Sequence, residues 1–257
     1  MITLFSPAKV NLFLRINRRR EDGYHELSSL FQAIDLGDFI SISQASSDLF
    51  TTNSREVPCD QSNLVMKALY LFRQKTALNF HVHIHLQKNI PIQAGLGGGS
   101  SNAATTLWGL NQLMGNPKSE AELMQLGAEL GSDVPFFFSH GTAHCMGRGE
   151  IVNELKLLKQ EKPLWLVKPP GRLSTQEVYG RLDLSTCSKK DELYVNDLEK
   201  PAFVAMPSLK ELKARLCNLY DRVVMTGSGT AFICEGHHDL GQKISFIERK
   251  VHAWYIG

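Results

Sequence analysis

Hydrophobic and polar residues alternate along the first part of the chain. From Lys9 onwards apolar side chains occupy every second position, which is typical of a strand with one buried face. Lys9 and Asn11 therefore point to the same side of this strand. A charged turn at residues 22–23 follows, and the segment 30–43 predicts two further strands broken at residues 37–38. The chain thus begins as a β-meander.

Farther along, apolar residues recur at helical spacing. Residues 60–77 predict a helix, residues 80–86 a strand and residues 103–114 a second helix. A third helix is predicted from Ser119, which opens a capping-box pattern, to Gly131. Helices and strands therefore mix along the chain, which predicts an α+β fold.

The second half begins after a charged connection. The segment 135–150 first predicts a buried strand over PFFF, then a turn and another strand. The charged residues 153–162 end at Pro163, and an apolar pattern restarts beyond it. We therefore predict two domains, residues 1–155 and residues 156–257.

Composition narrows the classes of partner. The chain has 257 residues, of which 43% are hydrophobic, and 28 Lys and Arg face 26 Asp and Glu. This balance argues against a nucleic-acid or membrane surface as the main partner. The five cysteines are widely spaced with no CxxC pair, so we expect no disulfide framework or zinc site, and a cytoplasmic location. The first residues do not resemble a signal peptide, and no apolar run is long enough to span a membrane.

A glycine-rich segment, IPIQAGLGGGSSNAATTLWGL, joins the predicted strand to the second helix. A Walker loop is excluded, because no lysine occurs between Lys88 and Lys118. A dinucleotide-binding turn fits poorly, because Ser100 replaces its third glycine and Pro91 interrupts the passage from the strand. A flexible linker is a further interpretation, but small helix-forming residues follow at once. We therefore predict that the amides of residues 97–99, with nearby serine hydroxyls, bind an anion such as a nucleotide phosphate at the helix N-terminus.

At this point the sequence resembles a known family. The segment PIQAGLGGGSSNAA resembles the second motif of the GHMP small-molecule kinases, SPAKVNLFLRI their first and MTGSGTAFICEG their third. With DGYHEL and GSDVPFFF, the order of motifs resembles members that act on a cytidine diphosphate-linked methylerythritol. The resemblance extends over about residues 7–235. It implies a two-domain α+β fold, with an N-terminal β-α-β ATP-binding domain and a smaller C-terminal α/β sandwich domain.

The resemblance also implies the chemistry and the residues that perform it. The γ-phosphoryl group of ATP would be transferred to the tertiary 2-hydroxyl of the substrate, with Mg²⁺ as cofactor and with metal ligands that the sequence does not identify. Gly227, Ser228 and Gly229 would form the third motif's turn near the active site. The expected ATP-binding residues are Pro91, Gly95, Leu96, Gly97, Gly98, Gly99, Ser100, Ser101 and Asn102.

Lys9 and Asp133 occupy the positions that the family uses beside the reacting hydroxyl. Asn11 would line the same cleft, as its strand position suggests. Without the motif, a lysine on a short strand would more often be a solvated edge residue. Asp133 follows a helix end and precedes Pro135, so the local sequence fits an N-cap equally well.

Aromatic residues provide the expected site for the cytosine ring. Tyr24 and His25 lie in the turn after the first strand, where the family's matching pair stacks on and hydrogen-bonds the base. Tyr179 is a second candidate for the stack, although a role in helix packing fits its local sequence as well. We expect a monomer or a weak homodimer that binds this small molecule, and neither nucleic acid nor a membrane.

Two other clusters have simpler interpretations. His81, His83 and His85 share one face of a predicted strand, but residues two apart on a strand are roughly 7 Å apart, too far for three to bind one zinc ion. We expect them to face solvent. The arginines at residues 18–20 are more typical of a solvated hairpin than of a nucleic-acid site. Alternatively, they attract the diphosphate of the substrate.

Three rival functions stay open on the sequence alone. One is another GHMP kinase that acts on a different alcohol, against which DGYHEL argues. Another is a nucleotide-binding regulator without catalysis, which would not need both Lys9 and Asp133. The third is a nucleic-acid-binding module, which strongly salt-dependent binding would reveal.

Overall fold

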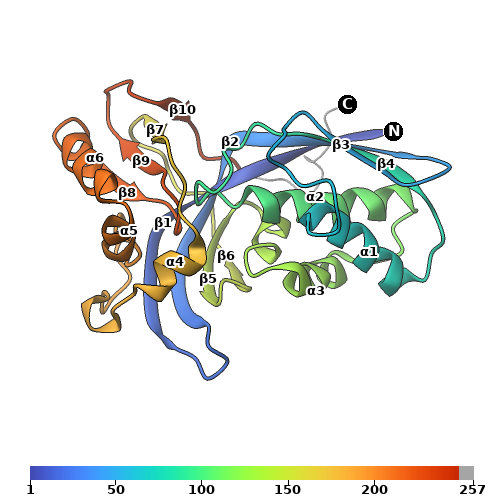
Figure 1. Cartoon of the computed structure of the whole chain (residues 1–257), viewed down its shortest axis with the longest axis horizontal. Helices are drawn as coiled ribbons and strands as arrows, with labels where there is room; N and C mark the ends of the chain where they lie inside the picture. Colours follow the sequence, from blue (N-terminus) through green and yellow to red (C-terminus); the bar gives the residue numbers. More distant parts are fainter. Residues whose placement is uncertain (249–257) are drawn as a thin grey trace.

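The computed structural model of the chain describes residues 1–248, so the last nine residues of the expected C-terminal domain lie outside the described part. Two β-sheets form its framework, and helices cover them (Figure 1). No helix among the described residues is long and apolar enough to cross a membrane.

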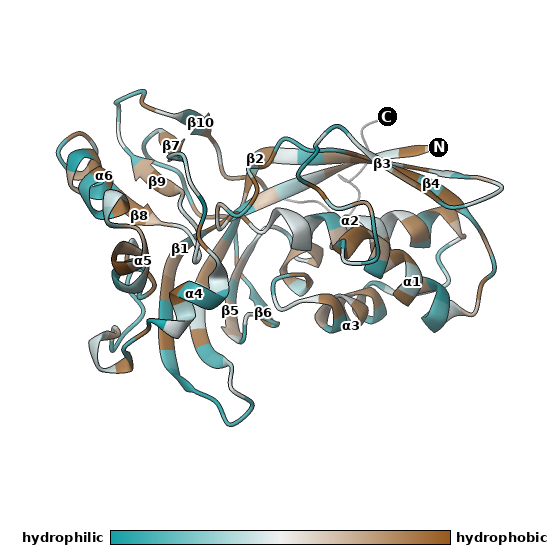
Figure 2. Ribbon diagram, viewed as in Figure 1, coloured by the Kyte–Doolittle hydropathy of each residue, from teal (hydrophilic) through white to brown (hydrophobic). Residues whose placement is uncertain are grey.

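The larger sheet is built around one long hairpin. Strand β1 (Ile2–Arg19) pairs with the antiparallel strand β2 (His25–Gln44) along nearly its whole length. The other edge of β2 pairs with two shorter strands, β4 near one end and β5 near the other. The remaining strands of the sheet are β3 (Leu49–Thr52), β4 (Val82–Gln87), β5 (Thr142–Gly147) and β6 (Ile151–Glu154). The tip of the β1–β2 hairpin is hydrophilic (Figure 2).

Strand β2 corrects the predicted break at residues 37–38, because it continues through them. Gly37 is needed there for packing rather than for a turn: a Cβ atom at this position would lie 2.4 Å from the ring of Phe5. Asp38 is fully buried and points its carboxylate at neighbouring elements. A glycine followed by an aspartate, which is typical of a turn, here belongs to a buried strand.

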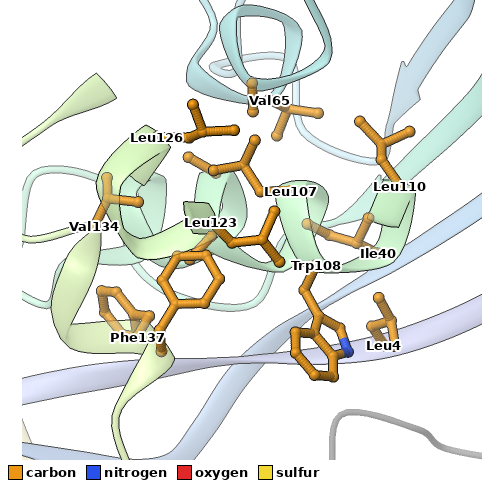
Figure 3. Packing of buried hydrophobic residues seen from close by; sticks show 14 of the residues in the cluster. Leu4, Ile40, Val65, Leu107, Trp108, Leu110, Leu123, Leu126, Val134 and Phe137 are labelled. Carbon is orange, nitrogen blue, oxygen red and sulfur yellow. The ribbon is translucent and has the colours of Figure 1, made fainter. Parts of the chain in front are cut away.

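Three helices lie on one side of this sheet: α1 (Leu64–Thr76), α2 (Gly98–Leu113) and α3 (Glu120–Leu130) (Figure 1). Helix α2 is innermost and is buried on every side over residues 101–111, and it packs on β1, β2, α1 and α3. Leu107 and Trp108 of α2 lie in the hydrophobic core that this packing creates (Figure 3). The capping box at the start of α3 is confirmed.

The PFFF segment corrects a second prediction. It forms a short 3₁₀ helix, η1 (Pro135–Phe138), instead of a strand. Proline lacks an N–H group and has a fixed φ, so it favours the first turn of a helix over a paired strand. All four residues are buried, and Phe136 makes an edge-on contact with Phe31 of β2.

The second sheet has four strands in the order β10-β7-β9-β8. Helices α4, α5 and α6 accompany it (Figure 1). Its strands and the remaining helical segments are β7 (Leu164–Val167), α4 (Thr175–Gly180), η2 (Leu184–Thr186), α5 (Glu199–Ala205), α6 (Pro207–Cys217), β8 (Arg222–Met225), β9 (Phe232–Glu235) and β10 (Gln242–Ile244).

The hydrophobic cores cross the connection between the two sheets. Leu14 and Ile16 of β1 pack with Val178 and Leu209 of the second half in one buried cluster. The backbone N–H of Leu14 also donates to the carbonyl of Val195 at 2.9 Å. The connection between β6 and β7 contains the predicted boundary at residues 155–156, but β1 contributes to both halves, so this boundary stays a prediction.

Candidate active site

A cavity of about 1400 Å³ lies where the long hairpin, the glycine-rich loop and the second sheet meet. Segments that are far apart in the sequence contribute to its wall. The predicted site residues that line it are Lys9, Asn11, Tyr24, His25, Gly95, Gly97, Gly98, Gly99, Ser100, Asp133, Tyr179, Gly227 and Ser228. The motifs that the sequence singled out therefore meet at one cavity.

The N-terminus of α2 opens into this cavity. Gly97 is the N-cap residue, with φ of 65°, and no side chain caps the helix, whereas Asn63 caps α1 and Ser119 caps α3. Backbone N–H groups at an uncapped helix N-terminus have no acceptor within the helix, so they can bind an acceptor from outside it. A Cβ atom at Gly97 would lie 2.9 Å from Cγ of Lys9, so only glycine lets the turn approach that lysine. The turn is thus suited to an anion that lies next to Lys9.

Five predicted residues do not line the cavity: Pro91, Leu96, Ser101, Asn102 and Gly229. The hydroxyl of Ser101 is fully buried and hydrogen-bonds that of Ser6 at 2.8 Å, and the amide of Asn102 also donates to Ser6. The expectation that the Ser101 hydroxyl faces the anion is therefore corrected, because this side chain points into the protein. Both residues therefore stabilise the loop through hydrogen bonds inside the protein.

Lys9 and Asp133 lie close together at the floor of the cavity. Lys9 is 3% exposed, and its Nζ is 3.4 Å from Oδ2 of Asp133 and 2.7 Å from Oδ1 of Asn11. The ammonium also lies 4.3 Å from the centre of the Phe31 ring. Asp133 does not cap a helix, since Val134 occupies the N-cap of η1. Its carboxylate is partly exposed to the cavity and is held by Lys9.

The third motif lies in the turn between β8 and β9 and fixes Asn11. The hydroxyl of Thr226 accepts a hydrogen bond from the backbone N–H of Asn11 at 3.0 Å, and the Asn11 amide donates to the hydroxyl of Ser29 at 2.8 Å. Thr226 and Ser29 are both fully buried. Thr226 belongs to the third motif, but the sequence indicated no contact with Asn11 for either residue, since a single hydroxyl carries no pattern. Thr226 and Ser29 together fix Asn11, which in turn hydrogen-bonds Lys9.

Two glycines bring the ATP loop and the third motif into backbone contact. A Cβ atom at Gly95 would lie 2.1 Å from the carbonyl oxygen of Thr226, and one at Gly229 would lie 2.1 Å from backbone atoms of Ala94 and Gly95. Real Cβ atoms do not approach that closely, so any side chain would push the two turns apart. These glycines serve packing between the halves of the molecule.

The aromatic residues form part of the same cavity wall. The rings of His25 and Tyr179 are 5.2 Å apart, and the Arg148 guanidinium lies 5.1 Å from the Tyr24 ring. Burial, and secondarily Arg19, lower the pKa of His25 below its ordinary value, so its ring is neutral at neutral pH. Arg148, which the sequence did not indicate, also lines the cavity. These residues offer flat rings and positive charge.

No group of three or more His, Cys, Asp or Glu side chains that could hold a metal occurs within residues 1–248. Strand β4 contains His83 and His85 and begins directly after His81, and its residues Val82, Ile84 and Leu86 are buried. His81 is exposed, while His83 and His85 are half-buried and both hydrogen-bond the hydroxyl of Thr51. The expected solvent-facing orientation is therefore correct for His81 and only partly correct for the other two.

Comparison with known proteins identifies the class. The model of the GHMP kinases N terminal domain matches residues 63–141, which include α1, the glycine-rich loop and Asp133. A solved structure described as 4-(cytidine 5'-diphospho)-2C-methyl-D-erythritol kinase superposes with a TM-score of 0.78 at 34% identity, over 91% of this chain and 90% of that one. The fold and the three converging motifs define a small-molecule kinase of the GHMP type.

Two curated relatives narrow the class further. A 4-diphosphocytidyl-2-C-methyl-D-erythritol kinase of Protochlamydia amoebophila is 51% identical over 99% of this chain and 93% of its own length. The chloroplastic/chromoplastic enzyme of the same name from Solanum lycopersicum is 45% identical over 99% of this chain and 73% of its own. The chain therefore belongs to the 4-diphosphocytidyl-2-C-methyl-D-erythritol kinase family.

Proposed function

We propose that the protein transfers the γ-phosphoryl group of ATP to the tertiary 2-hydroxyl of 4-diphosphocytidyl-2-C-methyl-D-erythritol, in the non-mevalonate route to isoprenoid precursors. The observation that carries the proposal is the convergence of Lys9 and Asp133, whose charged atoms are 3.4 Å apart, beside the uncapped start of α2. A triphosphate on the amides of Gly97 to Gly99 would present its terminal phosphorus to an alcohol beside these two side chains.

In this mechanism the substrate oxygen attacks phosphorus while the bond to the bridging oxygen of ADP breaks. The hydroxyl proton passes to Asp133. A hydroxyl has a pKa close to that of water and is far less acidic than an aspartic acid, with a pKa near about 4. This transfer therefore comes late, after the bond to ADP has largely broken. Lys9 lies where it stabilises the negative charge of both the oxygen and the carboxylate. Most of the rate then comes from positioning and charge neutralisation.

For the ATP loop we propose fewer ligand contacts than the sequence suggested. We propose that the amides of Gly97, Gly98 and Gly99 and the hydroxyl of Ser100 contact phosphate. Leu96 contributes through its backbone, because its carbonyl accepts the N–H of Lys9 at 3.0 Å and so joins the loop to the catalytic strand. Pro91 and Gly95 shape the turn.

For the cytosine ring we propose a stack against Tyr24 and Tyr179, with His25 forming hydrogen bonds to the base. A neutral imidazole carries one donor and one acceptor nitrogen, which suits a base edge. Arg148 would face the diphosphate or the base from the same wall. Gly227 and Ser228 would close the cavity from the C-terminal half.

Mg²⁺ fits this site as an ion carried mainly by the nucleotide. Magnesium usually takes one or two protein carboxylates and completes its shell with phosphate oxygens and water. The hydroxyl of Ser100 is an oxygen donor of the cavity wall that would hold it, while Asp133 stays free to accept the proton. When bound, Mg²⁺ neutralises charge on the β- and γ-phosphates.

The wider assignments complete the proposal. We assign residues 1–155 to the ATP-binding domain and residues 156–257 to the C-terminal domain, in a protein that works in the cytoplasm as a monomer or weak homodimer. The five cysteines are free thiols, and Cys145 and Cys234 are buried, which suits a reducing compartment.

The test compares two acceptors at equal ATP and Mg²⁺. ADP release and ³¹P NMR are followed with the cytidyl substrate and with free methylerythritol phosphate. We expect rapid ADP release and a new phosphomonoester on the tertiary carbon with the cytidyl substrate alone. Equal rates with both acceptors would favour a different alcohol as the substrate and would contradict the role assigned to the aromatic residues.

A further inference from the structure

Beneath the ATP loop lies a buried carboxylate that the catalytic proposal does not use. Asp38 of β2 is fully buried, and Lys88, whose side chain is 9% exposed, forms an ion pair with it. Burying charges is costly unless they are paired and fully hydrogen-bonded. The hydrogen bonds around Asp38 show how the cost of burying this charge is offset.

Both oxygens of Asp38 are fully used. Oδ1 accepts the backbone N–H groups of Asn89 and Ile90 at 2.7 and 2.8 Å. Oδ2 accepts the side-chain amide of Asn102 at 2.9 Å, and also the Lys88 ammonium. A carboxylate has about four acceptor sites, and here each of them has a donor.

These four donors flank the ATP loop. Lys88, Asn89 and Ile90 form the entry to the loop, and Asn102 lies in the first turns of α2 at its exit. A second bond joins the entry to the same strand, because the Asn89 side chain donates to the carbonyl of Gly37 at 3.0 Å. Asp38 therefore fixes the two ends of the loop relative to each other.

The entry segment also touches the phosphate-binding turn itself. A Cβ atom at Gly98 would lie 3.0 Å from Nζ of Lys88 and 3.1 Å from Cγ2 of Ile90. Movement of residues 88–90 would thus change the position of the first amides of α2. Positions of such donors matter because electrostatic stabilisation depends on preset geometry.

We infer that Asp38 is a positioning residue for the ATP loop: by bonding the loop's entry and exit with its two oxygens, it sets the geometry of the amides that bind the nucleotide phosphates. The inference rests on the proposed function only in that the loop binds ATP. It assigns a specific task to a side chain that touches neither substrate.

The primary variant is Asp38→Asn. An amide has one acceptor oxygen and one NH₂ donor group. Two of the four groups that donate to Asp38 would therefore face the NH₂ group, which cannot accept their hydrogen bonds. Because this variant retains Lys88 without its partner, Asn102→Ala serves as a milder second variant. It removes one of the four bonds to Asp38, together with the bond to Ser6, and leaves the ion pair. Asp35→Asn is the matched control, since it makes the same substitution three residues earlier on the same strand, at an exposed side chain.

Equilibrium binding of ATP with Mg²⁺, without the alcohol, is measured by calorimetry well below each variant's melting temperature, and binding of the cytidyl substrate is measured separately. We expect Asp38→Asn to raise the Kd for ATP about tenfold and Asn102→Ala to raise it severalfold. Both should leave the Kd for the cytidyl substrate within about twofold, and Asp35→Asn should match the unmodified protein.

ATP binding that is unchanged in both variants would overturn the inference, and so would equal weakening of both ligands, which would indicate general loosening of the fold. If Asp38→Asn does not fold, Asn102→Ala decides alone. An unmodified protein that binds ATP but does not phosphorylate the cytidyl substrate would contradict the proposed function and leave this inference intact. Failure to bind ATP would overturn both.

Discussion

Lys9 illustrates how a few buried hydroxyl and amide groups orient a charge. Its ammonium is bonded to Asn11 at 2.7 Å, and Asn11 is in turn held by Ser29 and Thr226. Burial makes these bonds specific, because an unpaired polar group would cost about 1–3 kcal/mol there. The position of the lysine therefore depends on a threonine more than 200 residues away in the sequence.

This dependence predicts a difference between two substitutions of Thr226. Thr226→Val keeps the shape but leaves the Asn11 N–H without its acceptor, and we expect kcat to fall about tenfold, or ~1.4 kcal/mol. Thr226→Ser keeps the hydroxyl and should stay within about threefold. Steady-state kinetics with both substrates measures this. Equal losses in the two variants would show that the methyl group, and not the hydroxyl, matters.

The sequence predicted part of this arrangement. Strand alternation placed Lys9 and Asn11 on one face, and the family resemblance supplied Asp133 as its partner. The hydrogen bonds that join Thr226 and Ser29 to Asn11 were not predicted, since a contact between residues distant in sequence leaves no periodic signal. Ser101 was misplaced because the helical rotation at a glycine-rich start is hard to predict from composition.

Among the elements, two turns meet backbone to backbone. The turn that precedes α2 and the turn between β8 and β9 approach so closely at Gly95 and Gly229 that neither position has room for a Cβ atom. The sequence marked both turns as glycine-rich, and we interpreted Gly95 as a ligand contact. The structure adds that these glycines also join the two halves of the molecule.

We therefore expect Gly229→Ala to separate the two turns. Overpacking typically costs about 1–3 kcal/mol, and the displaced loop should raise the KM for ATP. Gly131→Ala is the control, since its new Cβ would meet only Val134 at an ordinary 3.5 Å. Thermal unfolding and ATP kinetics check the pair of variants. A Gly229→Ala protein as stable and active as the control would contradict the close contact.

A second element-scale prediction concerns the junction of α1, β3 and β4. Asp48 accepts two hydrogen bonds from Arg73 of α1, at 2.6 and 2.7 Å, and one from the backbone N–H of Val82 at the start of β4. The Arg73 bonds are the main cause that lowers the pKa of Asp48 below its ordinary value of 3.8. The carboxylate therefore stabilises the fold above about pH 4, and this contribution is lost as the pH falls through the lowered pKa.

Asp48→Asn should accordingly lower the free energy of unfolding at pH 7 by about 1–2 kcal/mol, the scale of hydrogen bonds to charged groups. The difference from the unmodified protein should shrink as the pH falls below about 4 and through the lowered pKa of Asp48. Urea unfolding at several pH values measures it. A difference that does not change with pH would show that the charge of Asp48 is unimportant.

At the scale of the whole molecule, the long β1–β2 hairpin connects the two halves. It pairs with strands of the first half, and its residues Leu14 and Ile16 pack into a core of the second. Sequence patterns predicted the α+β class and the three α-helices of the first half, α1, α2 and α3. They did not predict one uninterrupted β2 or the 3₁₀ helix at Pro135, because both depend on tertiary packing that overrides local turn and strand signals.

The central claim is that Lys9 from the first motif and Asp133 from beyond α3 act on one alcohol beside the bound triphosphate. The most direct measurement compares kcat and the Kd for ATP in Asp133→Asn and the unmodified protein. We predict that kcat falls by about 10²–10⁴, the usual contribution of a positioned acid or base, while the Kd for ATP changes less than about twofold. Turnover that stays near the original rate would contradict the claim.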